Sequence, residues 1–324
     1  MHSPRVFGAA QERPRAPSLV AIGNFDGVHL GHQAVLAQAS ALARAHGLAP
    51  LVLTFHPHPA AIVGRGNLPA LTTLPRKLEL LCRQASELCV VVEPFDHALA
   101  QTPPEQFVEQ LLVGKLDAKL VLVGEDFRFG RGRAGDFAEL ARLGQRHGFV
   151  AHAASLERDE DGPISSTRIR AALARGALTE VERLLGRPHA LSGVVVAGQG
   201  KGRSIGVPTA NLDGIAEAVP PHGVYAVLVD RRGDGGFTRL AGGVANFGVR
   251  PTLGAGPSFE VHLFDTAPDL YGQDLRVHLL ARLRDEQKFS GLPALRAQIE
   301  RDIAAARALT AQRLPDPSAL GAWY

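Results

Sequence analysis

The decisive stretch reads Gly23-Asn24-Phe25-Asp26-Gly27-Val28-His29-Leu30-Gly31-His32 and follows directly on the apolar run Leu19–Ile22. Residues 33–46 have the spacing of an amphipathic helix, so a strand runs through a glycine-rich turn into a helix. Glycines let a backbone approach a ligand closely, and a helix N-terminus presents free N–H groups and a positive dipole end. The two histidines can then face one phosphate group. A lone H-x-G-H would fit a plain turn with solvated histidines better, but the whole stretch with its flanks favours a nucleotide site.

The first half of the chain alternates between apolar runs and amphipathic stretches. This alternation predicts a doubly wound parallel sheet with helices on both faces, which places ligand sites outside the carboxyl ends of the strands. The loop quoted above follows the first run, and two further motif loops follow the second and the fourth. The predicted strands are 19–22, 51–55, 88–92, 120–123 and 149–153, and the predicted helices are 33–46, 76–85, 104–113, 136–147, 167–174 and 179–185.

The pattern changes after Gly186-Arg187-Pro188. Strand-like runs then follow one another with turns rich in Gly, Pro and Asp and without helices, which predicts an antiparallel β-barrel with one terminal helix. A chain of 324 residues is too long for one average domain. We therefore predict the α/β class with two domains, 1–186 and 187–324. The predicted barrel strands are 191–197, 224–229, 240–244, 259–264 and 275–283, and the predicted terminal helix is 293–308.

The composition is that of an ordinary globular protein, with 45% hydrophobic residues, 21% charged residues and a net charge of +3. Two cysteines without zinc spacing favour a reducing, cytoplasmic location. No apolar run approaches the roughly 20 residues that cross a bilayer. Residues 1–17 lack the apolar core of a signal peptide, so we predict a frayed start. A basic nucleic-acid-binding module is a rival interpretation, but no basic stripe interleaved with aromatic residues is visible.

Further motifs extend the first one. Ile164-Ser165-Ser166-Thr167-Arg168-Ile169-Arg170 opens a predicted helix, and Gly124-Glu125-Asp126-Phe127-Arg128-Phe129-Gly130 follows the fourth predicted strand. In the second half, Gly202-Arg203-Ser204-Ile205-Gly206-Val207-Pro208-Thr209-Ala210-Asn211 contains P-T-A-N. With these motifs the chain resembles the bacterial bifunctional riboflavin kinase/FAD synthetase family, from about Ser18 to about Ala306.

The resemblance implies that the first half transfers an adenylyl group from ATP to FMN. The acceptor phosphate is ionised at neutral pH, so the protein must mainly align the reactants and stabilise charge on the phosphorus. His29 and His32 are the expected catalytic residues. The expected ATP contacts are Gly23, Asn24, Asp26, Gly31, Ser165, Ser166, Thr167 and Arg170, and the expected flavin contacts are His58, Asp126 and Phe127.

Two of these assignments have a structural alternative. Asp26 is equally compatible with an Asx turn, and the Ser165–Thr167 segment with a plain helix cap. We favour phosphate binding for that segment because H-x-G-H occurs in the same predicted domain. Arg170, one turn into the helix, would then neutralise the leaving pyrophosphate.

The resemblance implies that the second half phosphorylates riboflavin to FMN. Thr209 and Asn211 lie two residues apart and share a face of an extended segment, and their oxygens suit Mg²⁺. Glu260 is the expected base that takes the proton from the ribityl 5′-hydroxyl. Without P-T-A-N, a polar turn and a solvent-facing carboxylate would explain these residues. No Walker A motif occurs, and the expected ATP contacts are Gly198, Gly202 and Arg203.

We therefore predict two sequential activities that use Mg-ATP, riboflavin to FMN and FMN to FAD. The partners are riboflavin, FMN, FAD and ATP, with no nucleic acid and no membrane, and the oligomeric state is unknown. The alternative is a single-activity nucleotidyltransferase with an inert barrel. P-T-A-N together with Glu260 speaks against that alternative.

Overall fold

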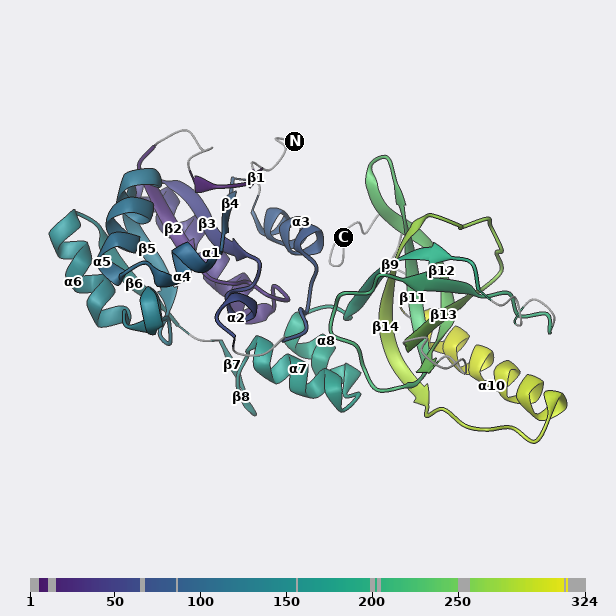
Figure 1. The fold of residues 1–324 in the computed structure, drawn as a ribbon. Helices are drawn as coiled ribbons and strands as arrows, with labels where there is room; N and C mark the ends of the chain where they lie inside the picture. Colours follow the sequence, from purple (N-terminus) through teal and green to yellow (C-terminus); the bar gives the residue numbers. More distant parts are fainter. Residues whose placement is uncertain are drawn as a thin grey trace. The chain divides into compact units, whose positions relative to one another are not determined.

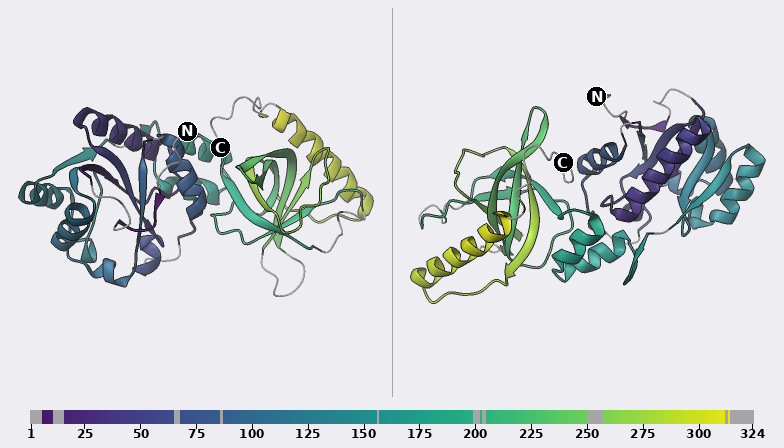
Figure 2. Two further views of the ribbon diagram at one scale, coloured as in Figure 1. Left: turned by 90° about the horizontal axis from the view of Figure 1, so that it is seen from above. Right: turned by 180° about the vertical axis from the view of Figure 1, so that it is seen from behind.

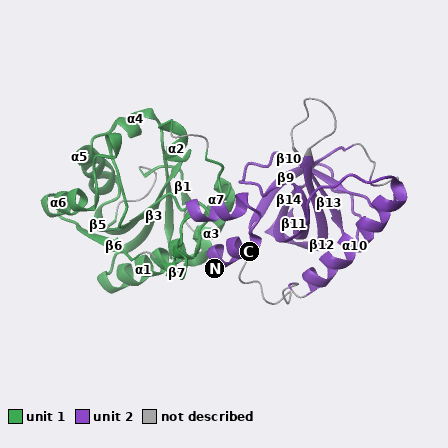
Figure 3. Ribbon diagram, turned by 90° about the horizontal axis from the view of Figure 1, so that it is seen from below, with its two compact units in different colours: residues 1–166 green, residues 167–324 purple. Residues whose placement is uncertain are grey.

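The structure is a computed structural model that describes residues 6–10, 16–64, 68–85, 87–155, 157–198, 202, 205–249, 257–311 and 313. The predicted ATP contact Arg203 and the predicted loose tail around Pro315 lie outside the described residues. The chain forms two compact units, residues 1–166 and 167–324 (Figure 3). No helix within the described residues is long and apolar enough to cross a membrane.

The first unit is built on a six-stranded sheet in the order β1-β4-β3-β2-β5-β6, and every pairing in it is parallel (Figure 1). The strands β3 and β4, which follow β2 in the sequence, lie on one side of it, and the next strands, β5 and β6, lie on the other side. The carboxyl ends around β2 therefore form the switch point at which such sheets bind ligands. The predicted doubly wound fold is confirmed. The strands are β1 (Val6–Phe7), β2 (Ser18–Ile22), β3 (Ala49–His56), β4 (Cys89–Pro94), β5 (Ala118–Gly124) and β6 (Val150–Ala154).

Helices cover both faces of this sheet, as two further views show (Figure 2). Both faces must be shielded from water because successive apolar side chains of β2 point to opposite faces of the sheet. Leu19 and Ala21 pack against α1 (Leu30–His46) and α3 (Leu74–Gln84), whereas Val20 and Ile22 belong to the cluster on the opposite face. That opposite cluster includes side chains of the π-helix η2 (Phe107–Lys115) and α6 (Phe137–His147). Shorter helices are α2 (Pro59–Ile62), α4 (His97–Gln101) and α5 (Pro104–Gln106).

Two expectations for the first unit are wrong in detail. Val6–Phe7 is an edge strand beside β4, where a frayed start is predicted, and the backbone N–H of Ala10 donates to Glu93 Oε2 at 2.7 Å. Pairing and this hydrogen bond tie down a segment whose composition alone indicates disorder. The predicted helix 104–113 is a short α-helix followed by a π-helix. A small hairpin, β7 (Arg158–Asp159) and β8 (Gly162–Pro163), precedes α7.

The second unit is a closed antiparallel barrel in the order β10-β13-β12-β11-β14-β9, as predicted. Its strand β10 is additional to the predicted runs. The terminal helix α10 (Leu292–Ala311) packs on one side, where Ala306 joins a cluster with Leu280 and Phe264. The helix α7 (Ser166–Ala174) begins one residue before this unit and belongs to it from Thr167 onward. The unit also contains α8 (Leu178–Leu185). The barrel strands are β9 (Ala190–Val196), β10 (Ala210–Asp213), β11 (Gly223–Gly233), β12 (Gly236–Val249), β13 (Pro257–Leu263) and β14 (Asp274–Arg284).

A buried ion cluster holds three barrel strands together. The Asp230 carboxylate, fully buried on β11, accepts from His278 Nε2 on β14 and Arg239 Nε on β12, each at 2.6 Å. Burial alone would raise the pKa of Asp230, but His278 and Arg239 outweigh burial and lower it to about 2. The cluster therefore stabilises the folded barrel above the ordinary carboxyl pKa of 3.8, and this contribution disappears as the pH falls through about 2.

We expect Asp230→Asn to lower the free energy of unfolding by about 3–5 kcal/mol at pH 7, because it removes one partner of a buried charge pair. Urea unfolding followed by circular dichroism measures this change. Asp274→Asn is the matched control, because its ion pair with Arg232 lies at the surface, where such pairs contribute about 0–1 kcal/mol. Equal effects of the two variants would contradict a stabilising role for the buried cluster.

Candidate functional site

The loop after β2 has a backbone conformation that most side chains avoid. Phe25, Gly27 and Val28 have φ angles of 49°, 83° and 39°. A positive φ is unfavourable for a β-branched residue such as Val28, so the surrounding structure must hold the loop. Two hydrogen bonds do so locally: the N–H of Val28 donates to the Phe25 carbonyl at 3.2 Å, and Gln33 Nε2 donates to the Val28 carbonyl at 3.0 Å.

His29 and His32 stack at the start of α1. Their ring centroids lie 3.6 Å apart at an interplanar angle of 21°, and the His32 ring also meets the edge of Phe25. His29 is the N-cap of α1, and its Nδ1 accepts the backbone N–H of His32 at 3.3 Å. The Nδ1 atom is therefore the acceptor through which the His29 ring is held at the start of α1. The structure therefore brings the two predicted histidines together.

Gly31 lets the two sequence motifs of the first unit meet. A Cβ at Gly31 would lie 3.2 Å from the Ile164 carbonyl and 3.2 Å from His29 Nδ1. The hydroxyl of Ser166, the first residue of α7, donates to the Asp26 carbonyl at 2.8 Å. H-x-G-H and the first residues of I-S-S-T are thus neighbours. Thr167 and Arg170 belong to the second compact unit, and their predicted contacts with ATP stay predictions.

The contacts of Asp26 favour a role in shaping the loop. Its buried carboxylate accepts the N–H groups of Leu71 at 3.0 Å and Thr72 at 3.2 Å, and the Thr72 hydroxyl accepts from the N–H of Gly27. These bonds tie the glycine-rich loop to the segment that precedes α3. Through these longer-range hydrogen bonds Asp26 holds two loops together, and its predicted contact with ATP stays a prediction.

The predicted flavin contacts lie after β3 and β5. His58 Nδ1 accepts the N–H of Ala60 at 3.2 Å and caps the short α2. Phe127 is half-buried and stacks on Phe129 with ring centroids 5.5 Å apart, whereas Asp126 is exposed. Both loops lie at carboxyl ends of the sheet, as predicted. Their contact with a flavin stays a prediction.

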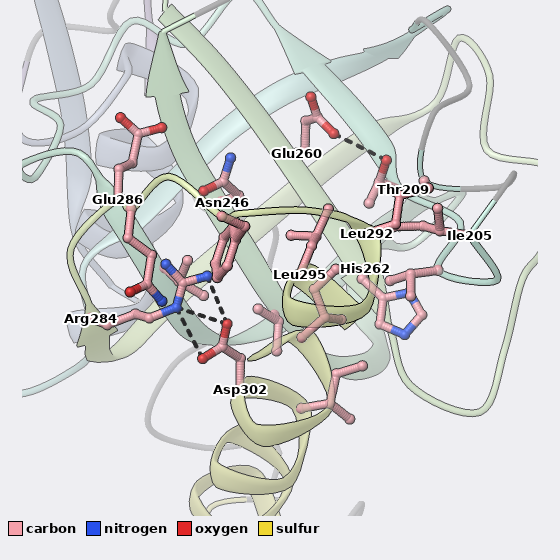
Figure 4. Close-up of a pocket in the computed structure, with 18 residues that line it drawn as sticks. Ile205, Thr209, Asn246, Glu260, His262, Arg284, Glu286, Leu292, Leu295 and Asp302 are labelled. Atoms are coloured by element: carbon pink, nitrogen blue, oxygen red, sulfur yellow. Dashed lines mark hydrogen bonds and ion pairs between the residues drawn. The ribbon is translucent and has the colours of Figure 1, made fainter. Parts of the chain in front are cut away.

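The second unit contains a cavity of about 540 Å³ (Figure 4). Its wall includes Thr209 from the P-T-A-N segment, Glu260 and His262 from β13, and Leu295 from α10. Glu260 and His262 are two residues apart on one strand, so both side chains lie on the same face. The cavity combines an apolar wall with a few convergent polar groups, which is typical of a small-molecule site.

Glu260 stands in a row of polar residues across three strands. It pairs directly with Asn211 on β10 and with Asn246 on β12, so the three side chains share one face of the barrel. The Glu260 carboxylate accepts the hydroxyls of Thr209 and Ser258, each at 3.2 Å. The structure therefore brings together Thr209, Asn211 and Glu260, which the sequence predicts as metal ligands and base.

The two described glycines of the predicted ATP loop lie against the P-T-A-N side chains. A Cβ at Gly198 would lie 2.2 Å from Asn211 Nδ2. A Cβ at Gly202 would lie 2.3 Å from the Val207 carbonyl and 3.2 Å from Thr209 Oγ1. A larger residue at Gly198 would displace the Asn211 amide, and one at Gly202 would clash with the backbone of Val207.

Several residues of this site are absent from the sequence-based assignment, among them Asn246, His262 and Arg284. Asn246 lines the cavity beside Glu260, and His262 Nδ1 donates to the Pro208 carbonyl at 2.9 Å, which anchors the P-T-A-N segment. Across the cavity, Arg284 Nε donates to Asp302 on α10 at 2.9 Å (Figure 4). The alternation of β13 could have indicated His262, because it is two residues after Glu260. The other two depend on strand register and helix docking.

Comparisons with known proteins find relatives for both halves of the chain. A family model described as FAD synthetase matches residues 11–168, and one described as riboflavin kinase matches residues 185–310. The chain is 41% identical to a bifunctional riboflavin kinase/FMN adenylyltransferase of Escherichia coli K12, over 91% of this chain and 94% of the relative. Relatives of the same description from Pseudomonas fluorescens and Bacillus subtilis 168 are 41% and 37% identical, covering 94% and 89% of this chain and 97% and 91% of their own lengths.

A crystal structure described as a macrolide-efflux protein from Streptococcus pneumoniae has the same two-part fold. It superposes with a TM-score of 0.80 at 29% identity, over 93% of this chain and 98% of the other. The description as an efflux protein concerns that chain alone.

Proposed function

Because the chain belongs to the family of bifunctional riboflavin kinase/FMN adenylyltransferases, it converts riboflavin to FMN and FMN to FAD, and we propose which residues carry each step. Adenylyl transfer is assigned to the loop after β2 with His29 and His32. Phosphorylation is assigned to the barrel cavity with Glu260. Both family models match, which argues against a single-activity enzyme with an inert barrel. The domain limit at Gly186 and the cytoplasmic location stay predictions.

In the adenylylation step, a phosphate oxygen of FMN attacks the α-phosphorus of ATP, and pyrophosphate leaves. Because the attacking phosphate is already ionised, the protein mainly has to align it and stabilise the charge that develops on the phosphorus. His29 is held at the helix N-terminus because its Nδ1 accepts the His32 N–H. His32, stacked 3.6 Å from it, supplies a second imidazole at the same helix N-terminus. This preorganised pair supports the assignment.

In the kinase step, Glu260 accepts the proton of the ribityl 5′-hydroxyl while that oxygen attacks the γ-phosphorus of ATP, and ADP leaves as the bond from this phosphorus to the bridging oxygen breaks. The hydroxyls of Thr209 and Ser258 hold the carboxylate, and Asn246 lies next to it. Magnesium suits this site because hydroxyl, amide and carboxylate oxygens converge there, and Mg²⁺ usually binds few protein ligands together with phosphates. Thr209 and Asn211 would hold the ion, which neutralises phosphate charge when bound. The described residues contain no cluster of three or more His, Cys, Asp or Glu that could hold a metal by itself.

The observation that carries this proposal is the meeting of separately predicted motifs in each unit: H-x-G-H with I-S-S-T, and P-T-A-N with Glu260. Incubation of the purified protein with riboflavin, ATP and Mg²⁺ tests the proposal. Chromatography should show FMN first and FAD afterwards. Accumulation of FMN without FAD would contradict the assignment of adenylylation to this chain, and omission of Mg²⁺ should abolish both products.

The kinase activity should be separable from the first unit. We expect fragments 167–324 and 187–324 both to convert riboflavin to FMN, because the cavity lies within the barrel and α10. The shorter fragment should unfold at a lower urea concentration, since it lacks the buried Val181 and Leu184 of α8 and the ion pair of Glu182 with Arg313 at 2.6 Å. Each buried aliphatic side chain contributes about 1.5–3 kcal/mol. FAD formation by either fragment would contradict the assignment of adenylylation to the first unit.

A further inference from the structure

A buried lysine joins the loop after β2 to the neighbouring strand β3. Lys77 lies on α3 and is 7% exposed. Its ammonium donates to the Asn24 carbonyl at 3.2 Å, to the Thr54 hydroxyl at 3.1 Å and to the Phe55 carbonyl at 3.4 Å. The Thr54 hydroxyl also donates to the Asn24 carbonyl at 3.1 Å. Asn24 belongs to the loop after β2, and the other two partners belong to β3.

The surroundings of this ammonium are unusual because its three partners are neutral. An ammonium has three donors and no acceptor, so three oxygens satisfy it completely. Among the described residues, ion pairs are formed by Lys115 and Lys119 but not by Lys77. Asp26 attracts Lys77 from a distance, while its carboxylate is bound to the N–H groups of Leu71 and Thr72. Burial lowers the pKa of Lys77 to about 8, and Asp26 opposes this shift, so the side chain is mostly charged at neutral pH.

Burial of a cation without a paired anion costs stability, and an apolar side chain would remove that cost. The position of Lys77 suggests a function that would explain why this stability cost is tolerated. The ammonium clamps the carbonyl of Asn24 onto β3, one residue before the strained Phe25. It also places a positive charge near the carboxyl ends of the strands, where such a sheet binds ligands. Both reactants of adenylyl transfer are phosphate anions, and a charge in a poorly solvated site acts on them more strongly than one in water.

We propose that Lys77 is a positioning residue for adenylyl transfer, which holds the loop of His29 and His32 in its working conformation by clamping Asn24 onto β3. This inference rests on the assignment of adenylylation to that loop. Lys77 is not expected to touch the reacting atoms, because its three donors are already used. Its effect should therefore fall mainly on kcat, with a smaller effect on the KM values for FMN and ATP.

Lys77→Met and Lys77→Arg test the proposal in the full-length protein. Methionine keeps an unbranched side chain but removes the donors and the charge, and misplacement of catalytic groups by about 1 Å can cost about 10²-fold. We expect Lys77→Met to lower kcat for FAD formation from supplied FMN by about 10²-fold, and Lys77→Arg to recover at least tenfold of that loss. FMN formation from riboflavin by the same samples should stay unchanged. Lys119→Met is the matched control, because Lys119 forms a surface ion pair with Asp117, and its kcat should equal that of the unmodified protein.

A kcat for Lys77→Met within twofold of the unmodified protein would overturn the proposal, and so would equal losses in Lys77→Met and Lys77→Arg. If Lys77→Met unfolds the first unit, Thr54→Val provides the test, since it removes one acceptor of Lys77 and keeps the lysine. Thr54→Val should lower kcat about tenfold, and full activity would overturn the clamp.

His32→Ala, measured in the same assay, distinguishes a failure of the proposed function from a failure of the role of Lys77. If it leaves FAD formation intact, the proposed function fails. If it abolishes FAD formation while Lys77→Met remains active, only the role of Lys77 fails.

Discussion

Replacement of His32 by alanine is expected to lower FAD formation from FMN and ATP by two or more orders of magnitude. The physical reason is the loss of a preorganised group at the point where negative charge develops, which in other enzymes costs about 10²–10³ in kcat. His32 is a cleaner probe than His29, because the His29 side chain also caps α1, and loss of a cap destabilises a helix by about 1 kcal/mol. The measurement is the rate of pyrophosphate release with supplied FMN.

Two comparisons make this experiment decisive. His46→Ala removes an exposed histidine from the last turn of the same helix and should leave the rate unchanged. Riboflavin phosphorylation by His32→Ala should also be unchanged, because that step is assigned to the second unit, and an unchanged circular dichroism spectrum would show that the first unit is folded. A double variant His29→Ala/His32→Ala with nearly normal FAD output would contradict the proposed charge stabilisation.

Glu260→Gln is expected to lower FMN formation by about 10²–10⁴-fold, the usual contribution of a general base. Glutamine keeps the length of the side chain and an oxygen that can accept the Thr209 or Ser258 hydroxyl, but it cannot take up the proton. Riboflavin and Mg-ATP should therefore still bind. Rapid-quench measurement of FMN formation, with binding followed by flavin fluorescence, separates the two effects.

The same variant reports on the independence of the two activities. Glu260→Gln should still adenylylate supplied FMN at the normal rate, because that chemistry is assigned to the first unit. Glu286→Gln changes the charge equally at another part of the cavity wall and should lower the kinase rate less than tenfold (Figure 4). If Glu260→Gln keeps normal kinase turnover, the base is another group. If it also loses adenylylation while folded, the two sites are coupled.

Much of the fold could be predicted because its signals are local. The alternation of apolar runs with amphipathic stretches marks β2 to β6 and their helices within a few residues, and the change of pattern after Gly186 marks the barrel. The failures occur where distant contacts decide the outcome. Val6–Phe7 becomes a strand only because β4 offers it an edge, and β10 is a strand because it pairs with both β9 and β13. A short segment carries no periodic signal that could reveal such pairings.

The predicted site residues were found through motifs, whose glycines and polar residues are adjacent in the sequence. Neighbouring residues were enough to predict the glycine-rich turn that joins a strand to a helix at His29–His32, and the shared face of Thr209 and Asn211. Backbone conformation and strand alternation are local properties of the chain. Three other contacts could be known only from the folded chain: Asn246 stands beside Glu260, Asp26 holds the segment before α3, and Lys77 clamps Asn24 onto β3. Those contacts depend on strand register and helix docking, which arise when surfaces far apart in the chain are buried against one another.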